Sequence, residues 1–326
     1  MLMAPDTTSD GSPQKTAVEL WYGAKGRAQQ DSPATNAQGL TKRARGKGMK
    51  IAIQGEPGSF SHEAAMKLCA EGVIVPFSLS ADVFAALVSG EVDAAAIPIE
   101  NSLAGSVAEH FDLLLTNDVV VERETLLRIR HNLIAISGAA AAEIDRVFSH
   151  PVALAQCRRF LANHPRMEAF ASYDTAGSVK QLVELRDRRA AAIASEAAAH
   201  YYGAQILEAG IEDNEENYTR FFLVRRAAEA QTDADSNKIS VAFSVENKPG
   251  SLVAALSELS ALGTNLTKIE SRPVHGKPWE YIFYVDFQLS APEEGTRALD
   301  ALRPHCSMVK ELGRYREAVK PGQTGA

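Results

Sequence analysis

The sequence predicts an α/β protein in which two lobes face one cleft and a small βαββαβ unit follows. Short apolar strands alternate with helical segments from Lys50 onward, which is typical of a parallel sheet covered by helices on both faces. Residues 227–237 contain no large apolar side chain and indicate a linker. Residues 238–315 then follow the ferredoxin-like order of elements. Its strands are expected at 238–245, 265–272, 280–288 and in a final short segment, and its helices at 250–262 and 296–302.

The composition limits the class of protein. Of the 326 residues, 45% are hydrophobic and 23% are charged, which is ordinary for a globular protein with two or three compact units. The net charge of -7 argues against binding to nucleic acid, because such proteins carry basic stripes. No apolar run reaches the length of a membrane span, and three scattered cysteines indicate thiols in a reducing compartment. We therefore expect a cytoplasmic protein with no nucleic-acid partner and no membrane partner.

The two ends of the chain differ from the rest. Residues 1–48 are rich in small and polar side chains and end in a basic run at 42–47, which predicts a disordered extension. They contain no apolar core of a secretory signal, and acidic residues such as Asp6 weaken a transit-peptide interpretation. Residues 316–326 are expected to form a frayed tail.

The two lobes are predicted within 49–226. A long strand-like stretch at 126–136 marks the crossing into the second lobe, at about 127–205, and the chain returns near 205–207. In open α/β sheets, ligands bind beyond the carboxyl ends of the strands. The expected strands are 51–53, 73–75, 93–99, 147–149, 168–173 and 190–194. The expected helices begin near Phe60 with Ser59 or Ser61 as cap, cover 82–89 before Gly90, open at Pro151, and cover 175–186 with Thr175 as cap.

The most informative segment is Asn217-Tyr218-Thr219-Arg220-Phe221, which precedes a short apolar strand. A hydroxyl, a guanidinium and an aromatic ring follow one another there, which suits a small anionic organic molecule. An ordinary strand start with a surface arginine is the alternative. Pro98-Ile99-Glu100-Asn101-Ser102 places an acid, an amide and a hydroxyl at the end of a strand, where helix capping is the alternative.

Two further segments lie at strand–helix junctions. In 149–157, Ser149 is an N-cap candidate and Gln156 lies two helical turns on, so both side chains are expected to turn toward the cleft. Capping together with a buried glutamine is the alternative, and His150 is either an acid–base group or a cap. The glycine-bearing turn at 54–61 offers the N–H groups of a helix start to an anion, or is a plain tight turn.

Several common catalytic motifs are absent. The chain has no GxGxxG after a strand, no GxxxxGK, no HExxH and no GxSxG. These absences argue against a nucleotide, a zinc ion and an acyl-enzyme. We therefore predict a protein with no cofactor and no metal.

Together, these segments resemble the motifs of prephenate dehydratases. The resemblance covers about 49–313 and implies a two-lobed catalytic domain of the periplasmic-binding-protein type II arrangement. It also implies the conversion of prephenate to phenylpyruvate, with loss of CO₂ and hydroxide, in L-phenylalanine biosynthesis. The matching residues are Gly55-Glu56-Pro57-Gly58-Ser59-Phe60-Ser61, Ile97-Pro98-Ile99-Glu100-Asn101-Ser102, Ser149-His150-Pro151, Ala153-Leu154-Ala155-Gln156-Cys157 and Thr219-Arg220-Phe221, with Val152 where the family usually has glutamine.

The same resemblance implies roles for individual residues. Thr219 matches the residue beside the departing hydroxyl, so we expect it to be catalytic as a hydrogen-bond donor. Arg220 is expected to grip the pyruvyl carboxylate or to brace the motif, because a clamp on the leaving carboxylate would stabilise the ground state. The other expected substrate contacts are Asn101, Ser149 and Gln156 for the polar groups, and Phe221 as an apolar wall for the ring.

The C-terminal unit resembles an ACT domain, the amino-acid-sensing module of this family. Its signatures are Pro249-Gly250-Ser251-Leu252-Val253, with Ser251 where alanine is common, and Glu270-Ser271-Arg272-Pro273. Gly250 lets the backbone approach a ligand closely, and the helix start offers N–H donors to an amino acid's carboxylate. The resemblance implies feedback regulation by L-phenylalanine, bound between paired ACT domains of a homodimer or homotetramer. An ordinary helix start is the alternative for the first signature.

Two other functions stay open at this point. An arogenate dehydratase carries out the same chemistry on the transaminated substrate, which differs only by an amine. A non-enzymatic amino-acid sensor also combines two lobes with an ACT domain. The intact Thr219-Arg220-Phe221 motif argues against the sensor.

Overall fold

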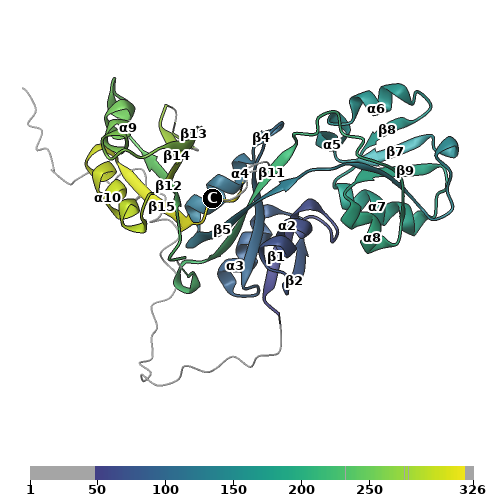
Figure 1. The fold of residues 1–326 in the computed structure, drawn as a ribbon, viewed down its shortest axis with the longest axis horizontal. Coiled ribbons are helices and arrows are strands. Elements are labelled where there is room, and N and C mark those ends of the chain that lie inside the picture. The colour runs from purple at the N-terminus through teal and green to yellow at the C-terminus, as the bar shows by residue number, and fades with distance from the viewer. Residues whose placement is uncertain (1–47, 232, 275, 278, 320–326) are drawn as a thin grey trace, which may run out of the picture. The chain divides into compact units, whose positions relative to one another are not determined.

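The computed structural model describes residues 48–319 except Thr232, His275 and Pro278. The predicted N-terminal extension, apart from Gly48, and residues 320–326 of the predicted tail lie outside the described part. The described residues form three sheets, of six, five and four strands (Figure 1). None of their helices has the length and apolar character needed to span a membrane.

The first sheet holds the strands of the first lobe in the order β2-β1-β3-β11-β5, with β4 paired to β3. β1 runs parallel to β2 and β3, as predicted, but β11 runs antiparallel to β3 and β5, so the prediction of a parallel sheet is wrong for this part. The chain leaves the lobe along β5 and returns along β11, which explains their opposite directions. The strands are β1 (Lys50–Gln54), β2 (Val73–Phe77), β3 (Ala94–Asn101), β4 (Gly105–Ser106), β5 (Val119–Arg128) and β11 (Tyr218–Arg226).

Helices cover both faces of this sheet. α2 (Phe60–Leu68) packs on one face, and α3 (Ser80–Ser89) and α4 (Ala108–Thr116) pack on the other. Ser59 caps α2, and Gly90 ends α3 in the left-handed conformation, both as predicted. α4 has no counterpart among the predicted elements.

The second lobe contains the sheet β10-β6-β9-β7-β8. The predicted strand at 126–136 is divided, because the backbone changes lobes between the end of β5 and the start of β6. The helix that opens at Pro151 is short, since it ends at Ala155 with Gln156 as its C-cap. The elements are β6 (Asn132–Ala135), β7 (Arg146–Ser149), α5 (Pro151–Ala155), α6 (Arg158–Asn163), β8 (Glu168–Ala171), α7 (Thr175–Leu185), β9 (Ala190–Ala194), α8 (Glu196–Tyr202) and β10 (Gln205–Ala209), with a 3-10 turn at Ala141–Glu143.

In the second lobe, the caps predicted at Ser149 and Thr175 are wrong by one residue, whereas the alternative of His150 as a cap is confirmed. His150, and not Ser149, caps α5, since its Nδ1 accepts a hydrogen bond from the Val152 N–H at 3.3 Å. Asp174, and not Thr175, caps α7, since its carboxylate accepts from the Gly177 N–H at 2.6 Å. In both helices the capping side chain lies directly before the first helical residue, where it reaches the free N–H groups.

The C-terminal unit has the predicted ferredoxin-like order of elements. Its strands form the antiparallel sheet β13-β14-β12-β15. The second helix begins at Pro292, four residues before the predicted start, because proline is well suited to the first helical position. The elements are β12 (Lys238–Ser244), α9 (Ser251–Ala261), β13 (Leu266–Pro273), β14 (Tyr281–Gln288), α10 (Pro292–Leu302) and β15 (Met308–Tyr315), and short 3-10 turns occur at Ala227–Glu229 and Arg303–His305.

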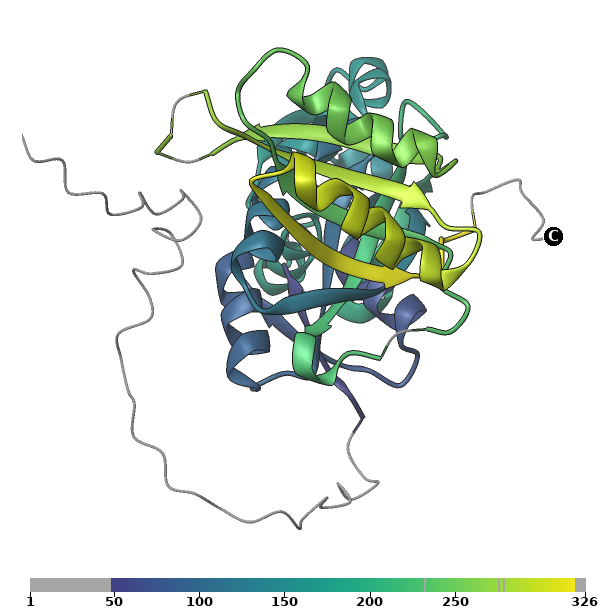
Figure 2. The same ribbon diagram turned by 90° about the vertical axis from the view of Figure 1, so that its left-hand side faces the viewer.

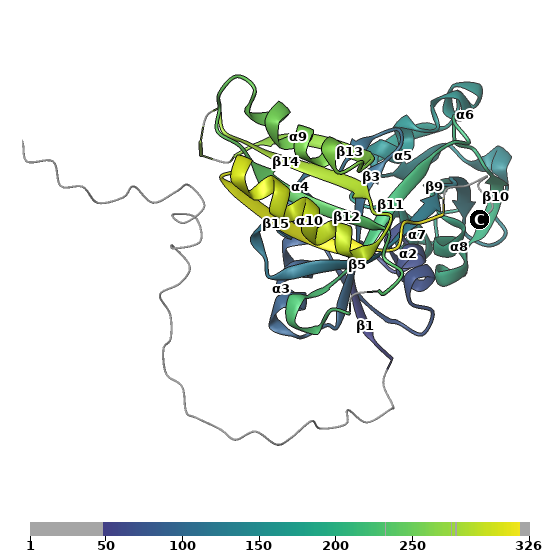
Figure 3. The same cartoon turned by 60° about the vertical axis from the view of Figure 1, so that its left-hand side comes forward.

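The sheet of this unit has two different neighbours. α9 and α10 cover its outer face and lie in front of the sheet in Figure 2. Its other face packs on the first lobe, where Tyr284 and Tyr315 share a core with Phe84 and Phe111. β15 contacts β5 along this boundary (Figure 3). The apolar core of the first lobe therefore continues into the C-terminal unit.

Gly313 marks the closest approach across this boundary. A Cβ atom at this position would lie 2.2 Å from the Val121 carbonyl oxygen. We expect Gly313→Ala to lower the free energy of unfolding by about 1–3 kcal/mol, because the added methyl group forces two backbones apart. Scanning calorimetry of the full chain checks this as a lower Tm. The matched control is Ser260→Ala, at an exposed position of α9, and an equal Tm for both variants would contradict the prediction.

Candidate active site

The hydroxyl of Thr219 is held by Asn101 at the ends of neighbouring strands. The two residues are direct partners in the β3–β11 register. Asn101 Nδ2 donates to Thr219 Oγ1 at 2.9 Å, while Asn101 Oδ1 accepts from the N–H groups of Leu103 and Ala104 at 3.0 and 2.8 Å. These backbone donors determine the orientation of the amide. Thr219 Oγ1 is therefore an acceptor in this pair, and its proton is left to donate to a bound molecule.

A chain of neutral polar groups continues from Asn101 into the second lobe. Asn101 Nδ2 also donates to Asn217 Oδ1 at 2.8 Å. Asn217 Nδ2 donates in turn to Gln156 Oε1 at 3.0 Å, and His131 Nε2 lies 2.8 Å from the same oxygen. Because Gln156 Oε1 is an acceptor, His131 donates from Nε2. The Gln156 amide nitrogen is left for another acceptor.

His131 is an uncharged member of this chain. Its side chain is buried, and the edge of Phe60 packs against its ring at a centroid distance of 5.6 Å. Burial lowers the pKa of His131, and the hydrogen bond to Gln156 and the Glu212 carboxylate offset this effect only in part. The imidazole is therefore neutral near pH 7, which agrees with donation from Nε2 alone.

The predicted anion turn at 54–61 instead forms a contact between the lobes. Gly58 N donates to His62 Nδ1, and the Gly58 carbonyl accepts from Ser195 Oγ of the second lobe at 2.6 Å. Glu56 forms an ion pair of 3.1 Å with Lys180 of α7. The N–H groups of Gly55 and Ser59 also have protein acceptors, the Phe77 and Glu56 carbonyls, and the geometry favours the plain-turn interpretation.

The structure does not bring Ser149 or Phe221 to the polar chain. Ser149 is fully buried and its Oγ donates to the Ile193 carbonyl at 2.6 Å. Phe221 is 2% exposed and lies in the core between the sheet and α2, beside Ile53 and Leu68. Both side chains are therefore packed within the protein, where they support the elements that carry Thr219 and Gln156.

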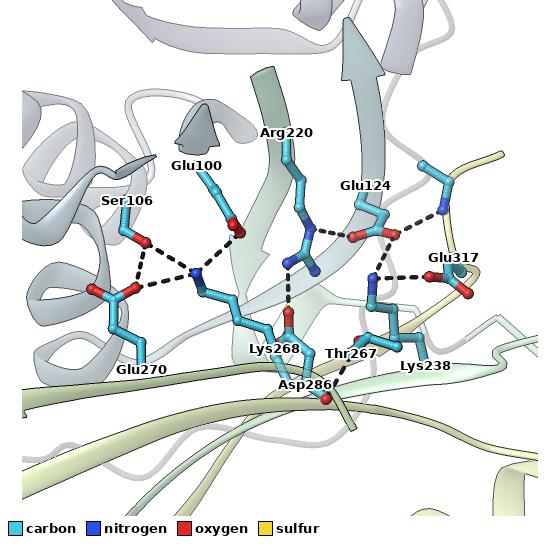
Figure 4. Close-up of polar contacts among 12 residues, drawn as sticks. Glu100, Ser106, Glu124, Arg220, Lys238, Thr267, Lys268, Glu270, Asp286 and Glu317 are labelled. Atoms are coloured by element: carbon cyan, nitrogen blue, oxygen red, sulfur yellow. Dashed lines mark hydrogen bonds and ion pairs between the residues drawn. The ribbon is translucent and has the colours of Figure 1, made fainter. Parts of the chain in front are cut away.

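Arg220 lies on the opposite face of β11 from Thr219, as strand alternation requires. Its Nε donates to Glu124 at 2.6 Å and its Nη1 to Asp286 at 2.5 Å (Figure 4). Its Nη2 donates to Tyr315 Oη at 2.8 Å. The guanidinium also lies 4.7 Å from the centre of the Phe222 ring. Burial lowers the pKa of Arg220, but its anionic and polar neighbours raise that pKa by more, so the group stays a cation. This geometry favours bracing over a grip on the substrate.

The two signatures of the C-terminal unit have different surroundings. Gly250 adopts the left-handed conformation at the start of α9, where Val253 is 67% exposed and Ser251 and Leu252 are half-buried. In β13, Ser271 and Pro273 are exposed, whereas the side chains of Glu270 and Arg272 contact the first lobe. Among the described residues, no hydrogen bond or ion pair joins the two signatures.

Some members of the site have only weak signals in the sequence. Asn217 lies two residues before Thr219, and its polarity beside a strand was the one cue to its role. His131 lies inside the stretch that was predicted as continuous strand. Within the described part of the chain, no group of three or more His, Cys, Asp or Glu side chains is arranged to hold a metal ion.

Comparison with known proteins identifies the family. The prephenate dehydratase family model matches residues 51–229, and the ACT domain model matches residues 239–303. The chain belongs to the prephenate dehydratase family. It is an α/β protein with an ACT domain, as predicted, and its homologues are lyases of the dehydratase type.

Two curated relatives and two solved structures illustrate the similarity. A bifunctional chorismate mutase/prephenate dehydratase of Aquifex aeolicus is 35% identical over 84% of this chain and 75% of the relative. Arogenate dehydratase/prephenate dehydratase 2 of Arabidopsis thaliana is 38% identical over 83% and 73%. The prephenate dehydratase of Arthrobacter aurescens in complex with L-Phe has a TM-score of 0.74 and 30% identity over 82% of this chain and 90% of that chain. GqqA, described as a novel type of quorum quenching acylases, has a TM-score of 0.75 and 31% identity over 83% and 98%.

Asn217 accepts a hydrogen bond from Asn101 and donates one to Gln156, so a change of its amide group affects both contacts. We expect Asn217→Asp to lower prephenate turnover by about tenfold or more, since a misaligned site loses rate steeply. The buried carboxylate cannot donate to Gln156 Oε1, and its charge would face that oxygen across the present 3.0 Å contact. Steady-state kinetics with prephenate checks this. Asn214→Asp is the matched control, because it makes the same change at an exposed turn, and equal turnover by both variants would contradict the prediction.

Proposed function

We propose that this chain converts prephenate to phenylpyruvate at the polar chain around Thr219. The observation that carries the proposal is the hydrogen bond from Asn101 Nδ2 to Thr219 Oγ1, at 2.9 Å. Because the threonine oxygen accepts this bond, its proton points to another acceptor. In the proposed complex this acceptor is the departing hydroxyl of the substrate.

The proposed chemistry needs little acid strength from the protein. Cleavage of the C–C bond releases CO₂ and leaves an electron pair that enters the ring as the C–O bond breaks. The departing hydroxide takes up a proton and leaves as water, and the new aromatic ring makes the reaction strongly downhill. A threonine hydroxyl is a weak acid, so Thr219 stabilises the developing charge with a hydrogen bond and relays a proton from water.

The other motif residues divide into two groups in this proposal. Gln156 contacts a polar group of the substrate, because its amide nitrogen remains available as a donor. Asn101, which was expected to contact the substrate, orients Thr219 instead, because both its amide hydrogens and its oxygen are bonded within the protein. Arg220, Ser149 and Phe221 support the site without contacting the substrate, because their polar or apolar contacts are with the protein.

An arogenate dehydratase is the second candidate function. Its support is the name of the Arabidopsis thaliana relative, which includes both activities. The two substrates differ by an amine in place of a keto oxygen, and no described acidic side chain on the polar chain favours the amine. Product formation from each substrate separates the two.

An acylase, the description given for GqqA, has less support in this chain. Ser80 Oγ lies 2.9 Å from His110 Nε2, which is the distance of a nucleophile and its base. Ser80 and His110 are 2% and 0% exposed, however, so an acyl substrate does not reach them. This geometry favours a structural role for the pair.

The proposal also includes regulation and assembly. L-phenylalanine binds at the ACT domain with Gly250–Val253 and Glu270–Pro273 as the site and lowers activity, supported by the ACT match and by the L-Phe complex of the similar Arthrobacter aurescens protein. A homodimer or homotetramer in the cytoplasm supplies the paired ACT domains. We propose 49–226 as the catalytic domain, 227–237 as the linker and 238–315 as the ACT domain.

Replacement of Thr219 tests the catalytic proposal. We expect Thr219→Val to lower kcat by about 100-fold or more with little change in KM, because it removes the donor and keeps the shape. Thr219→Ser is the control, since it keeps the hydroxyl and should retain most of the activity. Loss of substrate affinity with turnover preserved would instead make Thr219 a binding residue and overturn the mechanism.

The effector site is tested by adding a charge at the start of α9. We expect L-phenylalanine to lower the rate and raise the Tm of the native chain. Val253→Asp should raise the half-inhibiting concentration by about tenfold or more, because the new carboxylate opposes that of the effector. Ser257→Asp adds the same charge to an exposed position of the same helix and is the control. Unchanged inhibition in Val253→Asp would place the effector elsewhere.

A further inference from the structure

The residues directly beside the catalytic pair face the ACT domain. In the register of β3 and β11, Asn101 pairs with Thr219 and Glu100 pairs with Arg220. Successive residues of a strand point to opposite faces of a sheet. Asn101 and Thr219 therefore share the substrate face, and Glu100 and Arg220 share the back of the same two strands.

Arg220 is held from the ACT sheet by a buried network. Asp286 Oδ2 of β14 accepts a hydrogen bond from Arg220 Nη1 at 2.5 Å. The other carboxylate oxygen of Asp286 accepts from Ser240 Oγ of β12, also at 2.5 Å. Tyr315 of β15 accepts from Nη2 of Arg220 and contacts Ser240. Asp286 and Tyr315 thus contact the side chain that follows Thr219 in sequence, and Ser240 of a third ACT strand connects the two. Figure 4 shows the contact of Asp286 with Arg220.

Glu100 is held from the ACT sheet by Lys268 of β13. Lys268 Nζ lies 3.0 Å from Glu100 Oε2, 3.1 Å from Glu270 Oε2 and 3.0 Å from Ser106 Oγ (Figure 4). Ser106 follows the turn whose N–H groups orient the Asn101 amide. Lys268 therefore contacts Glu100 and Ser106, the residues on either side of the turn that follows Asn101.

We propose that Lys268 and Asp286 are positioning residues of the dehydratase reaction, supplied by the ACT domain. By holding Glu100 and Arg220 from behind, they keep Asn101 Nδ2 within hydrogen-bond distance of Thr219 Oγ1. The proposal rests on the proposed role of Thr219 as the donor to the departing hydroxyl. Lys268 also lies two residues before Glu270 in the same strand, so a ligand at the ACT signature acts on the catalytic pair through this contact.

The first experiment measures kcat and KM of Lys268→Met and Asp286→Asn in the full chain. We expect kcat to fall by about tenfold with KM within about twofold, because a small displacement of Thr219 costs rate and not affinity. Lys268→Arg keeps the charge and should restore most of kcat. Asp112→Asn is the matched control, since it removes another ion pair with the ACT domain, Arg272–Asp112, and should leave kcat unchanged. Unchanged kcat in Lys268→Met overturns the proposal.

A double substitution separates positioning from a general loss of stability. In a Thr219→Val background the pair has no hydroxyl to position, so Lys268→Met should change the residual kcat by less than about twofold. A full additional loss in that background overturns the proposal. If the native chain does not turn over prephenate, the proposed function fails. If Thr219→Val alone leaves kcat intact, the proposed role of Thr219 fails, and if only Lys268→Met leaves it intact, the positioning role fails. Lys268 and Asp286 lie on different strands, so a poorly folded Asp286→Asn still leaves Lys268→Met to decide.

Discussion

The buried guanidinium of Arg220 is the interaction on which the rest of the structure depends. Its side chain is 10% exposed, and its carboxylate partners Glu124 and Asp286 are 2% and 5% exposed. An unpaired charge in such a place costs several kcal/mol, so β5, β11 and the ACT sheet must stay in register with one another. Lys238 adds a second cation to Glu124 at 3.2 Å. The ACT domain is therefore an integral part of the core of the first lobe.

Strand alternation links the buried ion pairs of Arg220 to the candidate active site. Thr219 and Arg220 are neighbours in sequence but lie on opposite faces of β11, one toward Asn101 and one toward Asp286. A shift of β11 by one residue would exchange these faces and bury the wrong side chain. The ion pairs of Arg220 consequently fix the register of β11, and with it the face on which Thr219 lies. The same register of β11 is therefore required for the stability of the domain contact and for the geometry of the site.

Periodicity and turn chemistry predicted most elements of the fold, including the ferredoxin-like unit and the Gly90 helix end. The reversed direction of β11 was not predictable, because local sequence carries no signal for which strands pair. Thr219, Asn101 and Gln156 were predicted from their motifs and lie on one polar chain. The resemblance implied an apolar wall for Phe221 and either a grip on the pyruvyl carboxylate or a brace for Arg220. The motif itself does not show that Phe221 packs in the core or that Arg220 faces the ACT sheet. A buried network such as that of Arg220 depends on residues far apart in the chain, which one sequence does not connect.

The position of Arg220 also resolves a conflict in the chemistry. A cation on the substrate face would bind the carboxylate that must leave and would stabilise the ground state. Behind the sheet, between Glu124 and Asp286, its charge is compensated within the protein. The substrate face is left with neutral donors from Thr219 and Gln156, and with His131, whose pKa is lowered by burial. Neutral donors strengthen as the departing oxygen gains charge, and they hold a carboxylate less firmly than a guanidinium does. In the proposed mechanism, the alternation that directs Thr219 toward the substrate thus places on the other face the motif side chain that would most slow decarboxylation.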